Sequence, residues 1–282
     1  MITSIPFKPR AAMYSVPFAY DPPLERVMVV RASINGSAFL PFMLDTGCQD
    51  SLLLKESVAR ELGLIPEWLN PFRSHLGILT YRMNELNVKL YGLDVHGGPS
   101  MVAELPFALD ANCNLLKTDR YAGIIGARML DGMAVGFDFK HNMLTVCRGS
   151  DVQFLHSGWR SLPLLKHRSR ALIDVAINEG EPYNAIIDTG STITTAPESN
   201  LPLRSQHQSA KIVTLTSAFE TDWVQLSEAK VGPFTCRDIR MFREMPGTRN
   251  VVGIDVLSRL RFGINFHQKL IYIPDAETES PA

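Results

Sequence analysis

The chain has 282 residues, of which 45% are hydrophobic and 20% are charged, and its formal net charge is −1. This composition is typical of a soluble globular protein and gives no reason to expect a nucleic acid or a membrane surface as partner. No apolar run reaches the ~18 residues of a membrane span, and the first residues lack the apolar core of a secretory signal. We therefore expect a cytoplasmic protein.

The first half of the chain begins with strand patterns. The run Val27–Ile34 is rich in β-branched and apolar residues, and the Asn-Gly pair at 35–36 is a hairpin signal. The return strand 38–44 delivers Asp45 to a loop. A short helix is expected at 57–62, because a glycine and then a proline follow it.

The second half has a similar plan after a boundary at about 147–157, where the sequence shows no periodicity. Strands are expected at 171–177 and 183–187, and they again lead into an aspartate, Asp188. Two prolines, at 197 and 202, exclude a helix after it. The segments 211–219 and 222–231 are predicted to form a hairpin.

An Asp-Thr-Gly triplet occurs twice, at residues 45–47 and 188–190, so the copies are 188 − 45 = 143 residues apart. Each follows an apolar run, and an apolar-apolar-Gly segment follows later in each half, at 124–126 and 251–253. Two copies in matching contexts indicate an internal duplication. The duplication predicts one lobe at 13–150 and a second, related lobe at 157–275.

This paired pattern of triplet and apolar-apolar-Gly segment resembles the aspartic peptidase superfamily, and each small half is similar to a retroviral-type (retropepsin-like) domain. The resemblance covers roughly residues 15–273. It implies a mostly β fold with two retropepsin-like β-barrel lobes and a catalytic cleft between them. It also implies a single-chain aspartic endopeptidase that works as a monomer on an extended polypeptide. The alternative is an inactive retropepsin-like protein that binds peptides or serves as a scaffold.

Asp45 and Asp188 are the expected catalytic pair. Two carboxyl groups that share one proton supply both a base for water and an acid for the leaving nitrogen. Like charges about 3 Å apart cannot both ionise cheaply, so one pKa of the pair rises. Each aspartate could instead only cap a turn, but two copies at repeat positions favour the catalytic interpretation.

The other triplet residues are expected to brace this pair. The resemblance implies that Thr46 and Thr189 each hydrogen-bond the opposite loop. Gly47 and Gly190 leave their backbone N–H groups accessible to the carboxylates.

The residue after each triplet is expected to contact the neighbouring carboxylate. The hydroxyl of Ser191 would hydrogen-bond Asp188 more strongly than the thiol of Cys48 could bond Asp45. Asp188 would then ionise first. The alternative is that Cys48 points into the core and only packs.

The resembled family also has a hairpin flap over the substrate, and its best candidate lies within 76–81, at Gly77, Ile78, Thr80 and Tyr81. An ordinary surface hairpin is the alternative there. The four cysteines form no CxxC pair and the seven histidines form no metal-binding pattern. We therefore expect no metal and no cofactor.

Overall fold

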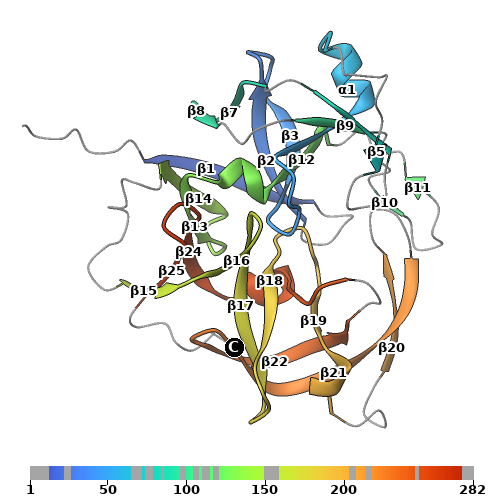
Figure 1. The fold of residues 1–282 in the computed structure, drawn as a ribbon, viewed down its shortest axis with the longest axis vertical. Coiled ribbons are helices and arrows are strands. Elements are labelled where there is room, and N and C mark those ends of the chain that lie inside the picture. The colour runs from blue at the N-terminus through green and yellow to red at the C-terminus, as the bar shows by residue number, and fades with distance from the viewer. Residues whose placement is uncertain are drawn as a thin grey trace, which may run out of the picture.

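The computed structural model describes residues 13–21, 27–64, 72–73, 79–83, 86–95, 100–103, 108–109, 115–116, 121–148, 159–202, 208–213, 218–244 and 248–274. These residues form mostly strands, with only short helices between them (Figure 1), which confirms the prediction of a mostly β protein. None of the helices in this part of the chain is long and apolar enough to cross a membrane. They are the α-helices α1 (Glu56–Glu61) and α2 (Ile254–Leu257) and the 3₁₀ helices η2 (Ala127–Leu130) and η3 (Glu198–Asn200).

The larger of two main sheets contains fifteen of the described strands and draws on both halves of the chain. In spatial order its strands are β15 (Trp159–Pro163), β25 (Leu270–Pro274), β24 (Arg261–Asn265), β13 (Met133–Asp138), β14 (Met143–Arg148), β1 (Tyr14–Asp21), β2 (Val27–Ile34), β3 (Leu40–Asp45), β12 (Gly123–Gly126), β4 (Leu52–Lys55), β9 (Met101–Ala103), β6 (Leu79–Arg82) and β5 (Phe72–Arg73), with β7 (Val88–Leu90) beside β2 and β8 (Leu93–Val95) beside β7.

The second main sheet contains eight described strands, all from the second half of the chain. Their order is β19 (Thr194–Ala196), β22 (Phe234–Arg243), β21 (Ala218–Val231), β17 (Arg170–Ile177), β18 (Tyr183–Ile187) and β23 (Val251–Val252), with β16 (Leu165–His167) beside β17 and β20 (Gln208–Val213) beside β21. A separate antiparallel pair joins β10 (Ala108–Leu109) and β11 (Leu115–Leu116).

The expectation of β-barrel lobes is wrong, because no sheet formed by the described strands closes on itself. The order of the larger sheet runs from β15 to β5, and that of the smaller sheet from β19 to β23. Three strands of the second half, β15, β24 and β25, extend the sheet of the first half instead of closing their own. Hydrogen bonds between β13 and β24 thus join the two halves of the chain in one sheet.

The same arrangement of three strands holds each triplet: a hairpin leads into it, and a later strand runs parallel to the second strand of the hairpin. In the first half β2 and β3 form a hairpin, and β12 runs parallel to β3 with Gly126 beside Asp45. In the second half β17 and β18 form the hairpin, and β23 runs parallel to β18 with Val252 beside Ile187. The last residues before each aspartate are buried and apolar, so packing fixes where each aspartate emerges.

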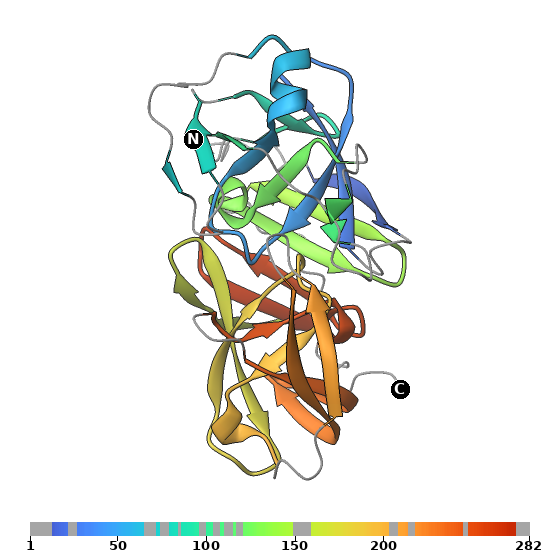
Figure 2. The same cartoon turned by 90° about the vertical axis from the view of Figure 1, so that its right-hand side faces the viewer.

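The two halves meet along the antiparallel pair β13–β24. Gly136 lies directly opposite Gly263, and these are the residues that the sequence repeat equates. The rings of Phe137 and Phe262 stack beside them, with centroids 4.9 Å apart. Figure 2 shows the first half, blue to green, above the second half, yellow to red. Backbone pairing and an apolar core therefore both cross the middle of the molecule.

Several local expectations can be compared directly with the structure. The helix expected at 57–62 is α1, and Gly63 follows it with φ 65°, the left-handed backbone that glycine adopts easily. After the second triplet the chain forms β19 and η3 and no α-helix, as the prolines predict. The strand expected at 211–219 has wrong bounds, because β20 ends at Val213 and pairs back onto β21 from Ala218.

Candidate active site

The two Asp-Thr-Gly loops face each other and are joined by reciprocal hydrogen bonds. The backbone N–H of Thr46 donates to Thr189 Oγ1 at 3.1 Å, and the N–H of Thr189 donates to Thr46 Oγ1 at 3.0 Å. Each hydroxyl then donates to a carbonyl of the opposite strand: Thr46 Oγ1 to Ile187 O at 2.6 Å, and Thr189 Oγ1 to Leu44 O at 2.7 Å. Both threonines are fully buried, so these four bonds hold the loops in one relative position.

The two carboxyl groups lie over the glycines of the opposite loops. A Cβ on Gly47 would overlap the carboxyl group of Asp188, and a Cβ on Gly190 would overlap that of Asp45. The Asp45 and Asp188 side chains also hydrogen-bond each other. Glycine is therefore required in each triplet, because any side chain there would displace a carboxylate.

The environment of Asp188 favours its protonated form. Burial raises the pKa of the Asp188 carboxyl well above its usual range, and the charge and hydrogen bond of Asp45 raise it further. The backbone N–H groups of Gly190, at 2.9 Å from Asp188 Oδ1, and of Ser191 lower this pKa, but each is a smaller influence than burial and the charge of Asp45. This direction of the Asp188 pKa is opposite to the expectation that Asp188 ionises first, and it favours the shared proton on Asp188.

The contacts expected from Cys48 and Ser191 exist, but they are made by backbone atoms. The N–H of Cys48 donates to Asp45 Oδ1 at 2.7 Å, while its buried side chain packs among apolar residues such as Met43 and Leu53. The hydroxyl of Ser191 donates to Ile193 O at 2.8 Å and thus does not serve Asp188. Both side-chain roles are corrected, because a turn after each triplet points the side chains away and the N–H groups inward.

The apolar-apolar-Gly segments support the loops from behind. The N–H of Ala127 donates to Cys48 O and the N–H of Ile254 donates to Ser191 O, each at 2.8 Å. A Cβ on Gly126 or Gly253 would collide with backbone carbonyl groups of the loop in front. Each loop is thus held by a strand that can approach closely only where it carries glycine.

Only part of the flap candidate can be placed. Gly77 and Ile78 lie outside the described residues. Thr80 and Tyr81 belong to β6, which pairs with β5 on one side and with β9 on the other. Thr80 is fully buried, so this residue serves the sheet.

The sequence reasoning missed two features near Asp188. One is a set of arginines, Arg168, Arg170 and Arg249, of which Arg170 lies close enough to Asp188 to interact electrostatically. The hairpin could have indicated that Arg170 lies near Asp188, because both residues lie two positions beyond the pair of Leu172 with Ile186.

The described residues contain no group of three or more His, Cys, Asp or Glu side chains suited to a metal ion.

The second missed feature is a bracket of hydrogen bonds that joins Thr194 to Asp255 behind the second triplet. Thr194 Oγ1 donates to Asp255 Oδ1 at 2.7 Å and accepts from the N–H of Gly253 at 3.0 Å. The N–H of Thr194 donates to Asp255 Oδ2 at 3.2 Å. No sequence motif had singled out this pair, because the contact joins β19 to α2 across 61 residues.

Comparison with known proteins adds an independent observation. No curated protein matches the chain. A protein-family model described as aspartyl protease matches residues 173–256, a range that begins in β17 and ends in α2. The matched range contains the second triplet, its supporting strand β23 and the bracket of Thr194 with Asp255. Residues 173–256 of this chain are thus similar to the aspartyl protease family.

Proposed function

We propose that the protein is an aspartic endopeptidase whose catalytic carboxyl groups are Asp45 and Asp188. The observation that carries the proposal is the carboxyl pair itself: two hydrogen-bonded aspartates held by reciprocal threonine bonds between two matching loops. The family match to residues 173–256 supports the same chemistry. The first half supplies Asp45 from outside the matched range, so the proposal includes a tandem of two related retropepsin-like lobes.

The geometry suggests a division of labour between the two carboxyl groups. With the shared proton on Asp188, Asp45 is ionised and takes a proton from a water molecule bound between them. Protonated Asp188 donates a hydrogen bond to the scissile carbonyl oxygen and so stabilises the charge that develops there. The water attacks the carbonyl carbon, and the proton gained by Asp45 passes to the leaving nitrogen. No covalent enzyme intermediate is needed.

The proposed substrate is a polypeptide in extended conformation. A strand-like peptide in a cleft between two lobes gains main-chain hydrogen bonds along its length. The hairpin of β5 and β6 is the proposed flap, with Thr80 anchoring its base in the sheet. Both lobes come from one chain, so a monomer is the proposed active form.

The experiment compares cleavage of a peptide mixture by the wild type, Asp45→Asn and Asp188→Asn, with products identified by mass spectrometry. Each substitution removes one member of the proton-sharing pair, and turnover should fall by at least about 10²-fold. Asp174→Asn is the matched control, because Asp174 is exposed on β17 and should leave cleavage unchanged. A statine-containing peptide should inhibit the wild type.

Near-normal cleavage by either dyad variant would exclude the two-carboxylate mechanism. A wild type that binds extended peptides but cleaves none would support the alternative of an inactive peptide-binding protein.

A further inference from the structure

Three arginines gather beside the second catalytic loop. Leu172 of β17 pairs with Ile186 of β18, so Arg170 and Asp188 each lie two residues beyond this pair, and the Arg170 guanidinium interacts electrostatically with Asp188. Residues opposite each other in an antiparallel pair project to the same face. Arg168 lies in the tight turn that precedes β17, and Arg249 lies just before β23.

The first half of the chain has an apolar residue, Val27, at the position that corresponds to Arg170, so the fold does not require a cation beside the catalytic loop. Val29 pairs with Met43, and Val27 and Asp45 each lie two residues beyond this pair, as Arg170 and Asp188 do in the second half. Val27 is only 6% exposed and packs in an apolar cluster that includes Cys48. The arginine beside Asp188 is therefore a feature of one side of the site only.

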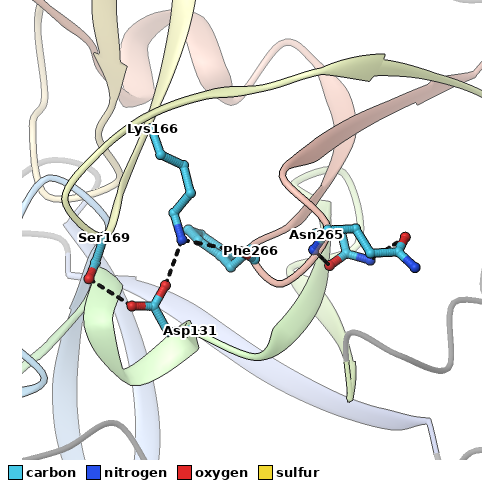
Figure 3. A network of polar contacts seen from close by, with 6 residues as sticks. Asp131, Lys166, Ser169, Asn265 and Phe266 are labelled. Atoms are coloured by element: carbon cyan, nitrogen blue, oxygen red, sulfur yellow. Dashed lines mark hydrogen bonds and ion pairs between the residues drawn. The ribbon is translucent and has the colours of Figure 1, made fainter.

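The turn that carries Arg168 is fixed against the first half of the chain. Figure 3 shows Asp131 accepting hydrogen bonds from Lys166 and Ser169 of this hairpin, at 2.7 and 2.8 Å. Arg168 Nη1 donates to Gln49 Oε1 at 2.6 Å, and Gln49 lies just after the first triplet. These contacts hold the turn, and with it the Arg168 guanidinium, against the segment that follows the first triplet.

Among the residues that the structure describes, the three guanidinium groups form no ion pair with a carboxylate. The Nε atom of Arg170 is buried and has no hydrogen-bond partner in this part of the chain. Buried polar groups in native proteins are usually hydrogen-bonded, so this donor is available to a ligand.

The positive charges of the three arginines repel one another, and, besides burial, this repulsion lowers the pKa of Arg170. Burial lowers the pKa of the Arg170 guanidinium, and the charges of Arg249 and Arg168 lower it further, while Asp188 opposes them. Desolvation and the same three arginines lower the pKa of His167. The positive charge of Arg170 thus lies near a dyad that carries one negative charge when it shares one proton, and Arg168 and Arg249 add positive charge close to Arg170. A further anion would relieve this imbalance.

We propose that Arg168, Arg170 and Arg249 form a carboxylate-binding subsite beside Asp188, which selects peptides that place a carboxylate next to the scissile bond. Arginine suits this role because its planar fork of donors matches a carboxylate. The carboxylate can come from an acidic side chain or from the C-terminus of the substrate. The inference rests on the proposed function in that a peptide must occupy the cleft.

The test measures binding separately from cleavage. Fluorescent peptides carry statine at the scissile position, apolar flanks and an amidated C-terminus, with either Glu or Gln at each flanking position in turn. A second set has no acidic side chain but ends in a free or an amidated C-terminus at the same distances. Binding is measured by anisotropy for the wild type, Arg249→Gln, Arg249→Glu and the control Arg160→Gln, an exposed arginine of β15 outside the set.

The wild type should bind one Glu peptide about tenfold more tightly than its Gln counterpart, a factor within reach of charge-assisted hydrogen bonds. Arg249→Gln should reduce this ratio, Arg249→Glu should invert it in favour of the Gln peptide, and Arg160→Gln should keep it. The ratio should shrink at 1 M salt, where the screening length is about 3 Å. A preference in the second set instead would assign the subsite to the substrate C-terminus.

Equal affinity for charged and neutral peptides in both sets, or a preference that Arg249→Glu leaves unchanged, would overturn the subsite. Failure of every peptide to bind would overturn it as well. Preferential binding without cleavage of the corresponding substrates would uphold the subsite and refute only the proposed catalytic function.

Discussion

Each threonine hydroxyl at the site serves the loop that it does not belong to. Thr46 Oγ1 accepts from the N–H of Thr189 and donates to Ile187 O, and both of these backbone groups are buried. Removing the hydroxyl would leave a donor and an acceptor without partners, which costs more than the bonds themselves contribute. The hydroxyls therefore couple the position of each carboxylate to the opposite half of the chain.

Thr46→Val keeps the shape of the side chain but removes its hydroxyl. We expect the free energy of unfolding, measured with denaturant, to fall by on the order of 2–4 kcal/mol, because two buried backbone groups lose their partner. Thr46→Ser is the matched control: it keeps the hydroxyl and should lose only about 1 kcal/mol for the missing methyl group. Equal stability of the Val and Ser variants would show that the hydroxyl contributes nothing to bracing.

Behind the second triplet, β19 and α2 are held together by one carboxylate. Asp255 accepts hydrogen bonds from the hydroxyl and N–H of Thr194 and from the N–H of Val256. The apolar-apolar-Gly segments are 251 − 124 = 127 residues apart, so the residue of the first half that corresponds to Asp255 is Arg128. The Arg128 side chain is exposed. The two halves thus support equivalent loops by different means.

Burial raises the pKa of the Asp255 carboxyl from 3.8 to about 6, although its hydrogen bonds oppose the change. A raised carboxyl pKa contributes stability that is complete below the unfolded-state value and is lost as pH rises through the folded-state value. Between pH 4 and 7, the stability of the wild type relative to Asp255→Asn should therefore fall by on the order of 2–3 kcal/mol. Denaturant unfolding of both proteins across this range measures the difference, and parallel pH profiles would contradict the raised pKa.

Across the whole molecule, the contacts that join the halves pair residues that occupy matching positions in the two copies of the repeat. Gly136 faces Gly263 in the β13–β24 pair, and Thr46 exchanges hydrogen bonds with Thr189, so residues equated by the repeat touch each other. Such self-matching contacts are typical of a two-fold interface between identical subunits. Here one chain supplies both sides, so the site needs no second copy.

On the proposed function, a mixture of Asp45→Asn and Asp188→Asn should remain inactive at any concentration. Each molecule pairs its own loops and therefore always contains one asparagine. Specific activity of the wild type should also stay constant on dilution. Recovery of activity in the mixture would show that loops from different chains form the site.

The sequence by itself determined the elements and the chemistry-bearing residues. The strands before each triplet, helix α1 and the mostly β class follow from local side-chain pattern and turn residues, which act over a few positions. The duplicated triplets singled out Asp45 and Asp188 because a repeat is visible without coordinates.

Only the tertiary structure decided which atoms act at the site and how the sheets end. Whether Cys48 offers a thiol or an N–H depends on the turn after the triplet, and the short range of sequence pattern leaves that direction open. The gathering of Arg168, Arg170 and Arg249 beside Asp188 joins segments far apart in the chain. The open sheets arise because β24 pairs with β13 of the other half, a choice made by long-range hydrogen bonds and packing that local sequence does not encode.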